Sequence, residues 1–320
     1  MLVLNEQNIR QAIGMSEVID AVDDAYRCYE NNTYQMPTRA HVQHGENTYL
    51  MMPCFTDEYL SNKLVTVYPD NKDTPVIQGV VLLNDGRNGT PLAMMNGAYM
   101  TGIRTGAIGG SAIRHLSKQE ASSAALIGTG VQGYFQLLAA CAERTLTDIY
   151  LFNRSAEKVP AFIGRLQEAL GKDIAIHHAK TTEEAIRQAD IIITATSSNE
   201  PVLPDDASLL EGKLIVGIGS FQPSMQEFPK AAYDICPSIY IDSEDAIHES
   251  GDLITPLSAG WLSKDSIIPF SKIVTGELMH PENQDTILFK STGMALFDAF
   301  VARNVYEAAR ERNIGDSVDL

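Results

Sequence analysis

The pattern of apolar and polar positions changes along the chain. Residues 16–30 carry apolar side chains at helical spacing, with acidic side chains mostly opposite them, which predicts an amphipathic helix. After a proline at position 37, short β-rich runs are separated by Gly, Asn, Asp and Pro, as in antiparallel strands. Besides a short strand at 2–4, the predicted strands of this part are 40–43, 48–52, 63–68 and 76–83.

Residues 101–116 predict a helix in which four glycines indicate close packing against another backbone or a ligand. Beyond it, strands and helices alternate, which predicts a parallel sheet. The strands are expected at 124–127, 148–152, 174–176, 191–196, 214–219 and 238–242, and the helices at 134–142, 155–170 and 182–188. A last helix at 293–312 has an apolar stripe that we expect to pack back on the first domain.

The fold class predicted is therefore α/β, with a Rossmann-type doubly wound parallel sheet and a β-rich α+β domain before it. We expect the first domain to cover residues 1–116, completed by a C-terminal helix at 293–320. The second would cover 117–292. A chain of 320 residues with 44% hydrophobic residues suits two such domains.

A glycine-rich loop organises the second domain. The apolar strand at 124–127 leads into Gly-x-Gly-x-x-Gly at 128–133, and apolar residues at helical spacing follow. In this arrangement the first glycine makes the turn, the second admits a pyrophosphate, and the third lets the helix pack close to the strand. An ordinary strand-to-helix turn is the alternative. We expect a dinucleotide, held in part by the loop residues Gly128, Thr129, Gly130, Val131 and Gln132.

The residues after the second strand bear on the choice of dinucleotide. An acidic residue there usually bonds the ribose 2′-hydroxyl of NAD, but this chain has Asn153, Arg154 and Ser155. A guanidinium and a hydroxyl at a helix start suit a 2′-phosphate, so NADPH is favoured over NADH. The alternative is that Ser155 only caps the helix and Arg154 is solvated. Further expected cofactor contacts follow later strands, at Ala195, Thr196, Ser197, Gly219 and Ser291, with simple turn capping as the alternative for the hydroxyl residues.

Charge and cysteine content exclude several classes of protein. The formal net charge of −17 argues against general affinity for nucleic acid or anionic membranes. Four scattered cysteines indicate reduced thiols, and no long apolar segment precedes the first domain, so a cytoplasmic protein is expected. No metal is expected, because the pairs His177–His178 and His41–His44 lack a third ligand.

Three cations of the first domain, Arg39, Lys63 and Arg104, lie within or beside apolar stretches. Cations beside buried surface often hold an anion, although a surface position is the alternative for any one of them. Near the C-terminus, Asp298 and Lys290 are candidates to approach the cofactor. A salt bridge on the helix surface is equally open for Asp298.

Several segments together resemble the ornithine cyclodeaminase/mu-crystallin family over nearly the whole chain. These are MMP at 51–53, KLV at 63–65, QGVVLL at 78–83, GTPLA at 89–93, TGIRTGA at 101–107, GTGVQG at 128–133 and LFKSTG at 288–293. The resemblance implies a homodimer in which the first domain binds substrate and forms the dimer interface. It also implies that Arg39, Lys63 and Arg104 hold a substrate carboxylate.

One departure from the family pattern bears on the reaction. The cyclodeaminases have an Asp six residues before a Glu, in GGDCPGKTE, whereas this chain has GSFQPSMQE at 219–227 with Phe221 at the Asp position. A phenyl ring accepts no proton, so ornithine cyclodeamination is disfavoured. The segment looks more like the reductase branch. We expect NAD(P)H-dependent reduction of a small cyclic ketimine 2-carboxylate, such as Δ1-pyrroline-2-carboxylate, to L-proline.

In this hypothesis Lys63 and Arg104 are the catalytic residues, Arg39 helps to hold the carboxylate, and Phe221 forms an apolar wall beside the substrate. Two alternatives stay open. One is reductive amination of a 2-oxo acid, as in alanine dehydrogenases that resemble the family. The other is NADPH binding without important catalysis, in the manner of mu-crystallin.

Overall fold

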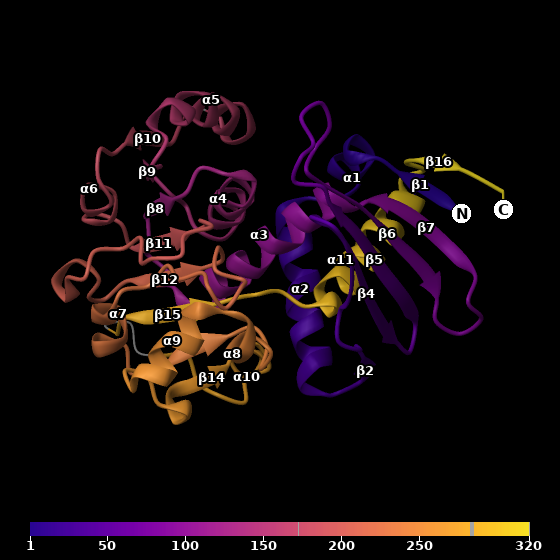
Figure 1. The fold of residues 1–320 in the computed structure, drawn as a ribbon. Coiled ribbons are helices and arrows are strands. Elements are labelled where there is room, and N and C mark those ends of the chain that lie inside the picture. The colour runs from indigo at the N-terminus through magenta and orange to yellow at the C-terminus, as the bar shows by residue number, and fades with distance from the viewer. Residues whose placement is uncertain (172, 282–284, 320) are drawn as a thin grey trace. The chain divides into compact units, whose positions relative to one another are not determined.

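A computed structural model of the protein describes residues 1–171, 173–281 and 285–319 (Figure 1). The chain divides into two compact units. The first joins Met1–Arg104 to Met294–Leu320, and the second is Thr105–Gly293. Helix α3 (Gly97–Leu116) begins in the first unit and ends in the second. The α/β fold class predicted from the sequence is confirmed by the two sheets described below.

The first unit is built on a mainly antiparallel sheet with the strand order β16-β1-β7-β6-β5-β4-β2, and β3 pairs with β4. Only the β1–β7 pair is parallel among the described strands of this sheet. The strands are β1 (Leu2–Leu4), β2 (Tyr34–Gln35), β3 (Ala40–His44), β4 (Asn47–Thr56), β5 (Tyr59–Val67), β6 (Ile77–Asp85), β7 (Pro91–Asn96) and β16 (Asp316–Ser317).

Helices α11 (Ala295–Glu311) and α1 (Glu6–Ala12) pack on this sheet, and α2 (Met15–Glu30) packs on α11. The apolar face of α2 is buried, and the ring of Tyr26 meets the ring of Phe297 on α11 edge-on, with centroids 4.9 Å apart. Helix α11 also contacts β4, β5 and β6. The expectation that the last helix packs on the first domain is therefore confirmed.

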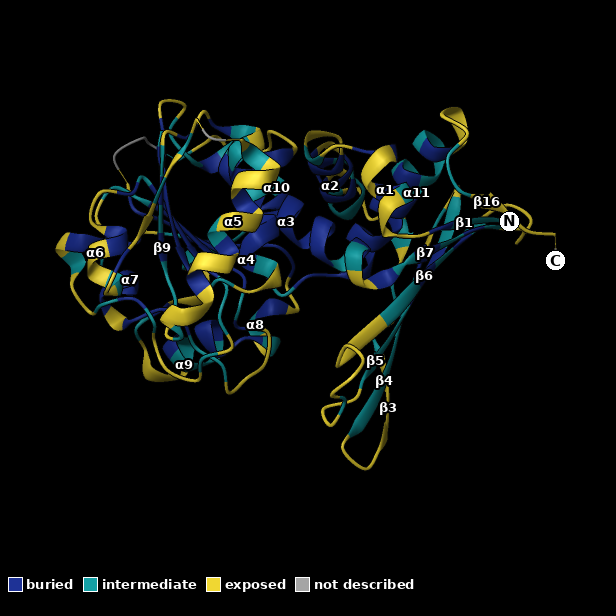
Figure 2. Cartoon of the chain, turned by 90° about the horizontal axis from the view of Figure 1, so that it is seen from above, coloured by how far each residue is buried: buried dark blue, intermediate teal, exposed yellow. Residues whose placement is uncertain are grey.

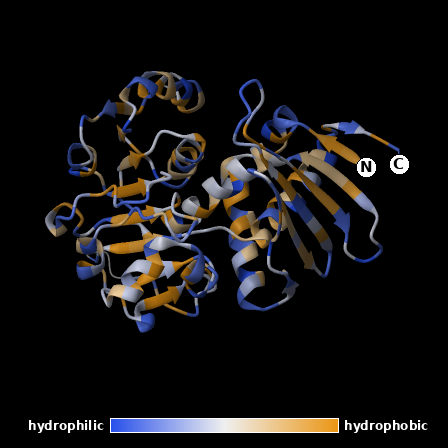
Figure 3. Ribbon diagram, viewed as in Figure 1, coloured by the Kyte–Doolittle hydropathy of each residue, from blue (hydrophilic) through white to orange (hydrophobic). Residues whose placement is uncertain are grey.

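The second unit contains an eight-stranded parallel sheet with the order β10-β9-β8-β11-β12-β15-β13-β14. Its strands are β8 (Ser123–Ile127), β9 (Asp148–Phe152), β10 (Ala175–His178), β11 (Ile191–Thr194), β12 (Leu214–Gly217), β13 (Ile239–Ile241), β14 (Ile267–Pro269) and β15 (Ile287–Lys290). Central strands such as β11 and β12 are apolar over almost their whole length, because both faces of the sheet are covered (Figure 3).

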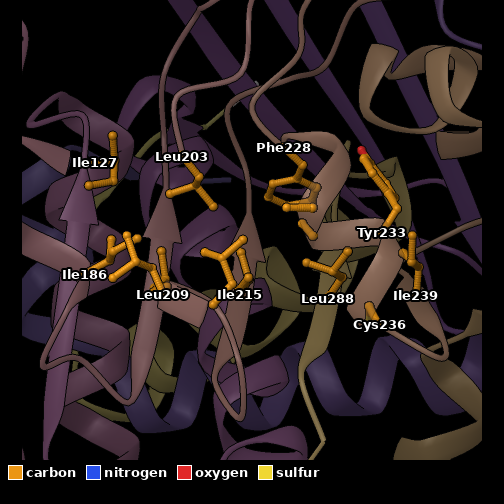
Figure 4. Close-up of a cluster of buried hydrophobic side chains, with 14 of the residues drawn as sticks. Ile127, Ile186, Leu203, Leu209, Ile215, Phe228, Tyr233, Cys236, Ile239 and Leu288 are labelled. Atoms are coloured by element: carbon orange, nitrogen blue, oxygen red, sulfur yellow. The ribbon is translucent and has the colours of Figure 1, made fainter. Parts of the chain in front are cut away.

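The helices of this unit are α4 (Val131–Glu143), α5 (Val159–Leu170), α6 (Thr182–Ile186), α7 (Lys230–Ile235), α8 (Ala246–Glu249), α9 (Gly251–Ala259) and α10 (Ser271–Val274). Short 3₁₀ helices occupy Ala156–Lys158, Ala207–Leu209 and Lys264–Ser266. A buried cluster packs strand residues such as Ile215 and Leu288 against Ile186, Phe228 and Tyr233 (Figure 4).

The glycines of α3 serve the close packing that the sequence predicts. A Cβ on Gly106 would lie 2.6 Å from the carbonyl oxygen of Phe135, on α4. A Cβ on Gly109 would overlap the side chain of Gln136, whose amide nitrogen donates to the carbonyl oxygen of Thr105 at 2.6 Å. The sequence left open whether these glycines pack against another backbone or against a ligand, and at Gly106 the structure shows a backbone, that of α4.

Some elements have no clear signal in the apolar pattern. Helix α1 has only seven residues and is stabilised locally, by reciprocal bonds between the side chains and amides of Asn5 and Asn8. Helix α9 contains Pro256, and β15 is a four-residue strand that ends in a buried lysine. The predicted helix at 155–170 begins as a 3₁₀ turn before α5, while the other predicted helices and strands lie within a few residues of their expected positions.

Candidate active site

The glycine loop between β8 and α4 has a backbone that side chains would obstruct. Gly128 has a φ of +103°, in the left-handed region, and a Cβ there would lie 2.6 Å from the carbonyl oxygen of Ala195. A Cβ on Gly133 would touch the carbonyl oxygen of Gly128, so this glycine lets α4 begin close to β8. Gly130 differs because it is exposed, and a Cβ there would meet no described atom within 4 Å. The loop is therefore open to a ligand at Gly130.

The start of α4 fits the phosphates of a dinucleotide. Its N-cap residue, Gly130, supplies no side chain to the first-turn amides, and that turn carries no acidic residue. Such amides lack partners within the helix and attract an anion. Within the described residues, the buried atoms Thr129 Oγ1 and Gln132 Oε1 have no hydrogen-bond partner. Open backbone and orphaned polar atoms thus occur together at the place where the fold binds a pyrophosphate.

The expected cofactor residues follow the carboxyl ends of the strands. The strand order reverses beside β8, with β9 on one side and β11 on the other, and ligands of open parallel sheets bind at such a reversal. Asn153, Arg154 and Ser155 follow β9, Ala195, Thr196 and Ser197 follow β11, Gly219 follows β12, and Ser291 follows β15.

The loop after β9 does not support simple capping by Ser155. Its side chain makes no capping hydrogen bond to the 3₁₀ turn at Ala156–Lys158, so the capping half of that alternative is wrong, whereas the exposure of Arg154 agrees with its other half. The Asn153 amide nitrogen donates to the carbonyl oxygen of Ser155 at 3.3 Å, and Arg154 is exposed. Both the guanidinium and the hydroxyl therefore remain available to a ligand.

In the first unit, strand register places Lys63 in an apolar row. Lys63 pairs with Met52 on β4 and with Val81 on β6, and Val81 pairs with Met95 on β7. All four side chains are buried on the face of the sheet that α11 covers. A lysine in such a row needs a carboxylate partner, since burial of an unpaired charge is costly.

Asp298, in the first turn of α11, is that partner. Its Oδ2 lies 2.8 Å from Lys63 Nζ, and its Oδ1 lies 3.2 Å from Arg104 Nε. The Asp298 side chain is 1% exposed, so a salt bridge on the helix surface is the wrong interpretation of this residue. The structure thus brings Lys63 and Arg104 together on a carboxylate that lies 235 residues from Lys63 in sequence.

The electrostatics of this cluster favour an added anion. Burial, reinforced by the charges of Arg104 and, more weakly, Arg39, lowers the pKa of Lys63 from 10.5 to about 8, against the opposing effect of Asp298. Arg39 is therefore close enough to Lys63 for its charge to be felt. A carboxylate from a ligand would add negative charge beside Lys63, so it would oppose the effect of Arg104 and raise the pKa of Lys63 again.

Phe221 does not belong to the same unit as the cation cluster. It belongs to the second unit, in the segment after β12, and half of its surface is exposed. Lys290 also lies in the second unit, fully buried, with its Nζ 3.3 Å from Asp252 Oδ2.

The sequence pattern did not reveal Asp298 as the partner of two cations. The one signal in the sequence is an acidic residue in the first turn of an apolar helix. This signal does not indicate which cations the residue would contact.

The described part of the chain holds neither a metal-binding cluster nor a membrane-spanning helix. There, no group of three or more His, Cys, Asp or Glu side chains is arranged to hold a metal ion. His177 instead stacks on Tyr150 and bonds Asp148 through Nε2 at 2.8 Å. Across residues 1–171, 173–281 and 285–319, the helices are all too short or too polar to cross a bilayer. The four cysteines, all within these ranges, are free thiols.

Comparison with known proteins agrees with both features of the site, the glycine loop and the buried cations paired with Asp298. A model of the ornithine cyclodeaminase/mu-crystallin family matches residues 1–313. The chain belongs to this family. It is 36% identical to a Δ1-pyrroline-2-carboxylate reductase of Bacillus cereus, over 329 aligned residues that cover all of both chains.

Two solved structures of the family are similar over almost the whole chain. The Δ1-pyrroline-2-carboxylate reductase of Thermococcus litoralis, in complex with NADH and L-proline, aligns with a TM-score of 0.91 and 32% identity over 99% of this chain and 100% of that one. An archaeal alanine dehydrogenase dimer with bound NAD aligns with a TM-score of 0.90 and 29% identity, over 100% and 99% of the chains. The predicted family and its fold are thereby confirmed.

Proposed function

We propose that this protein is an NAD(P)H-dependent oxidoreductase that reduces a small cyclic ketimine 2-carboxylate, such as Δ1-pyrroline-2-carboxylate, to L-proline. The observation that carries the proposal is the buried Lys63–Asp298–Arg104 cluster, which suits a small anionic substrate. Similarity to the Bacillus and Thermococcus reductases supports the reaction class. We assign substrate binding to the first domain and cofactor binding to the second.

The cations would act mainly by orientation. Arg104 and Arg39 bind the substrate carboxylate through charge-assisted hydrogen bonds, while Asp298 keeps Lys63 and Arg104 in place. A bound reduced nicotinamide supplies the hydride that forms the new C–H bond. The π electrons of the C=N bond pass to the nitrogen, which carries a proton from Lys63 or from a water that Lys63 orients. With its pKa near 8, Lys63 can give up a proton near neutral pH.

Phe221 separates this reaction from cyclodeamination. Removal of an amino group requires an acid or base in addition to hydride transfer, and the phenyl ring at position 221 supplies neither. Reduction of a preformed imine has no such requirement, since a protonated imine is already electrophilic. We propose that the Phe221 ring shields the bound imine from water.

The proposal is tested by mixing purified protein with NADPH or NADH and Δ1-pyrroline-2-carboxylate, and following loss of the reduced nicotinamide. The six-membered Δ1-piperideine-2-carboxylate should be compared in the same assay. We expect oxidation of the cofactor and formation of L-proline from the five-membered ring. The proposal fails if neither imine is turned over.

A second candidate, reductive amination of a 2-oxo acid, is supported by the similarity to the archaeal alanine dehydrogenase. It predicts cofactor oxidation with pyruvate that depends on ammonia, which the imine reaction does not need. A binding protein without catalysis is the third candidate. Tight cofactor binding without turnover of any imine or 2-oxo acid would favour it.

Arg154 is proposed to favour NADPH through the 2′-phosphate. Replacing Arg154 with alanine should lower kcat/KM for NADPH by about fivefold, because the lost contact is solvent-exposed, and should leave kcat/KM for NADH unchanged. Steady-state kinetics with both cofactors measure this. Arg187→Ala, at another exposed arginine of the second unit, is the control. An equal effect of Arg154→Ala on both cofactors would contradict the assignment.

We propose a cytoplasmic homodimer. Free thiols suit a reducing compartment. The large exposed apolar side chains of the sheet in the first unit suit a subunit interface, and the outer strands there are exposed or half-buried (Figure 2). These side chains are Val42, Phe55 and Ile77, together with Tyr68 and Val76 in the segment that joins β5 to β6. The wild type should sediment as a dimer and a Val42→Asp/Ile77→Asp variant as a monomer. A wild type that sediments as a monomer would refute the dimer.

A further inference from the structure

Glu227 is a fully buried carboxylate in the segment between β12 and α7 of the second unit. Both of its oxygens accept hydrogen bonds. Oε1 accepts from the backbone amide of Thr196 at 2.7 Å and from Thr196 Oγ1 at 2.8 Å. Oε2 accepts from the amides of Gly219 and Ser220 at 2.8 and 3.3 Å. One side chain therefore ties together the two loops that leave β11 and β12.

These two loops are in backbone contact. A Cβ on Gly219 would overlap the backbone of Thr196, so only glycine allows the approach. Thr196 and Gly219 lie beyond the carboxyl ends of neighbouring strands, on the β11 side of the point where the strand order reverses. The β9 side carries the residues expected at the adenosine ribose. The loops that Glu227 joins are thus placed to receive the other half of the dinucleotide.

A network of buried charges supports Glu227. Asp252 Oδ1 accepts from the amides of Glu227 and Phe228 at 2.7 and 3.0 Å, and Asp252 Oδ2 lies 3.3 Å from Lys290 Nζ. Asp242 in turn accepts from Ser291 Oγ at 2.6 Å and from two amides of the loop after β15. Burial raises the pKa of both Glu227 and Asp242, and the positive charge of Lys290 opposes that rise. Glu227 thus holds the loops after β11 and β12, and Asp242 holds the loop after β15. The charge of Lys290 acts on both carboxylates.

We propose that Glu227 is a positioning residue for the nicotinamide half of the cofactor, acting by holding the Thr196 and Gly219 loops at one fixed spacing. This inference rests on the proposed function only in taking a nicotinamide dinucleotide as the ligand. Glu227 itself is enclosed by donors from the protein and acts through Thr196 and Gly219. Its acceptors face three backbone N–H groups and one hydroxyl, an arrangement that a carboxylate satisfies and an amide does not.

Glu227→Gln tests the proposal, because it keeps the size of the side chain but turns an NH₂ group toward backbone N–H groups. We expect the dissociation constant of NADH to rise by about tenfold to a hundredfold, the range for a lost charge-assisted hydrogen bond. The dissociation constant of ADP-ribose, which lacks the nicotinamide, should change by less than about twofold because its loops lie on the β8 and β9 side. Calorimetry on the wild type and the variant gives both constants without any assay of turnover.

The matched control is Asp190→Asn. Asp190 Oδ2 also accepts three hydrogen bonds, from the amides of Ser122 and Ser123 and from Ser123 Oγ, but at the amino end of β8. The melting temperature of the ligand-free protein should fall in both variants. The ratio of the NADH and ADP-ribose dissociation constants should change only in Glu227→Gln. The proposal is overturned if that ratio is the same in Glu227→Gln, in Asp190→Asn and in the wild type.

Thr196→Val provides a second, milder test if Glu227→Gln does not fold. It removes one of the four donors, the Thr196 hydroxyl, and should raise the NADH constant relative to the ADP-ribose constant in the same direction by a smaller factor. An unchanged ratio would then overturn the proposal. Failure of the proposed reaction would be recognised separately, as absence of imine turnover by the wild type, and would leave the comparison of the two dissociation constants intact.

Discussion

Replacing Asp298 with asparagine is expected to lower the free energy of unfolding by about 3–5 kcal/mol, the range for breaking a buried ion pair from one side. The change leaves the size of the side chain almost unaltered. It removes the charge that faces Lys63 Nζ at 2.8 Å and Arg104 Nε at 3.2 Å, so two buried cations lose their counterion. Chemical denaturation of the ligand-free protein, compared with the wild type, measures the loss.

Asp24→Asn is a suitable control for this experiment. Asp24 also faces two arginines, with Oδ1 2.8 Å from Arg27 and Oδ2 3.4 Å from Arg303, but its side chain is 45% exposed. Exposed pairs contribute less than about 1 kcal/mol, because water already solvates both charges. The Lys63–Asp298–Arg104 cluster would lose its assigned importance for stability if Asp298→Asn cost no more than Asp24→Asn.

The same cluster shows how far a sequence can predict a site. The glycine loop was predictable because all its parts are local: the strand, the turn and the start of α4 follow one another within about 20 residues. That Lys63, Arg104 and Asp298 meet depends on strand register and on the return of α11 to the first unit, which local patterns do not encode. Only the family resemblance implied a common role for the three cations, and it did not include Asp298.

The order of strands in the second sheet has a similar explanation. Alternating apolar runs predicted parallel strands, and the structure has them. The position of β15 between β12 and β13 could not be predicted, because this short strand comes after β13 and β14 in the chain. The network of buried charges around Glu227 could not be predicted from the sequence either. Its buried lysine, Lys290, belongs to β15, whereas Glu227 and Asp242 lie in separate loops and Asp252 lies in the first turn of α9.

Replacing Lys63 with methionine should reduce kcat/KM for the cyclic imine by about 10²- to 10⁴-fold, the usual range for loss of a general acid. Methionine fits the apolar row of Met52, Val81 and Met95, and Asp298 keeps Arg104 as its partner, so we expect the fold to persist. Cofactor affinity should stay within about twofold if the assignment of substrate binding to the first domain is right. Lys213→Met, at another lysine whose pKa burial lowers, is the control and should retain activity.

The pH profile distinguishes a role for the Lys63 proton from a purely structural one. Because the pKa of Lys63 in the folded protein is about 8, the side chain loses its charge as the pH rises through 8, and kcat/KM should fall with it. Stability should move the other way. Between pH 8 and the unfolded value of 10.5, the unfolded chain holds more protons at this site, so the contribution of Lys63 to the free energy of unfolding rises with pH. Activity that falls while this contribution rises cannot be explained by unfolding. Lys63→Arg, which keeps its charge, should lack the alkaline fall; an unchanged alkaline fall in that variant would assign the titration to another group.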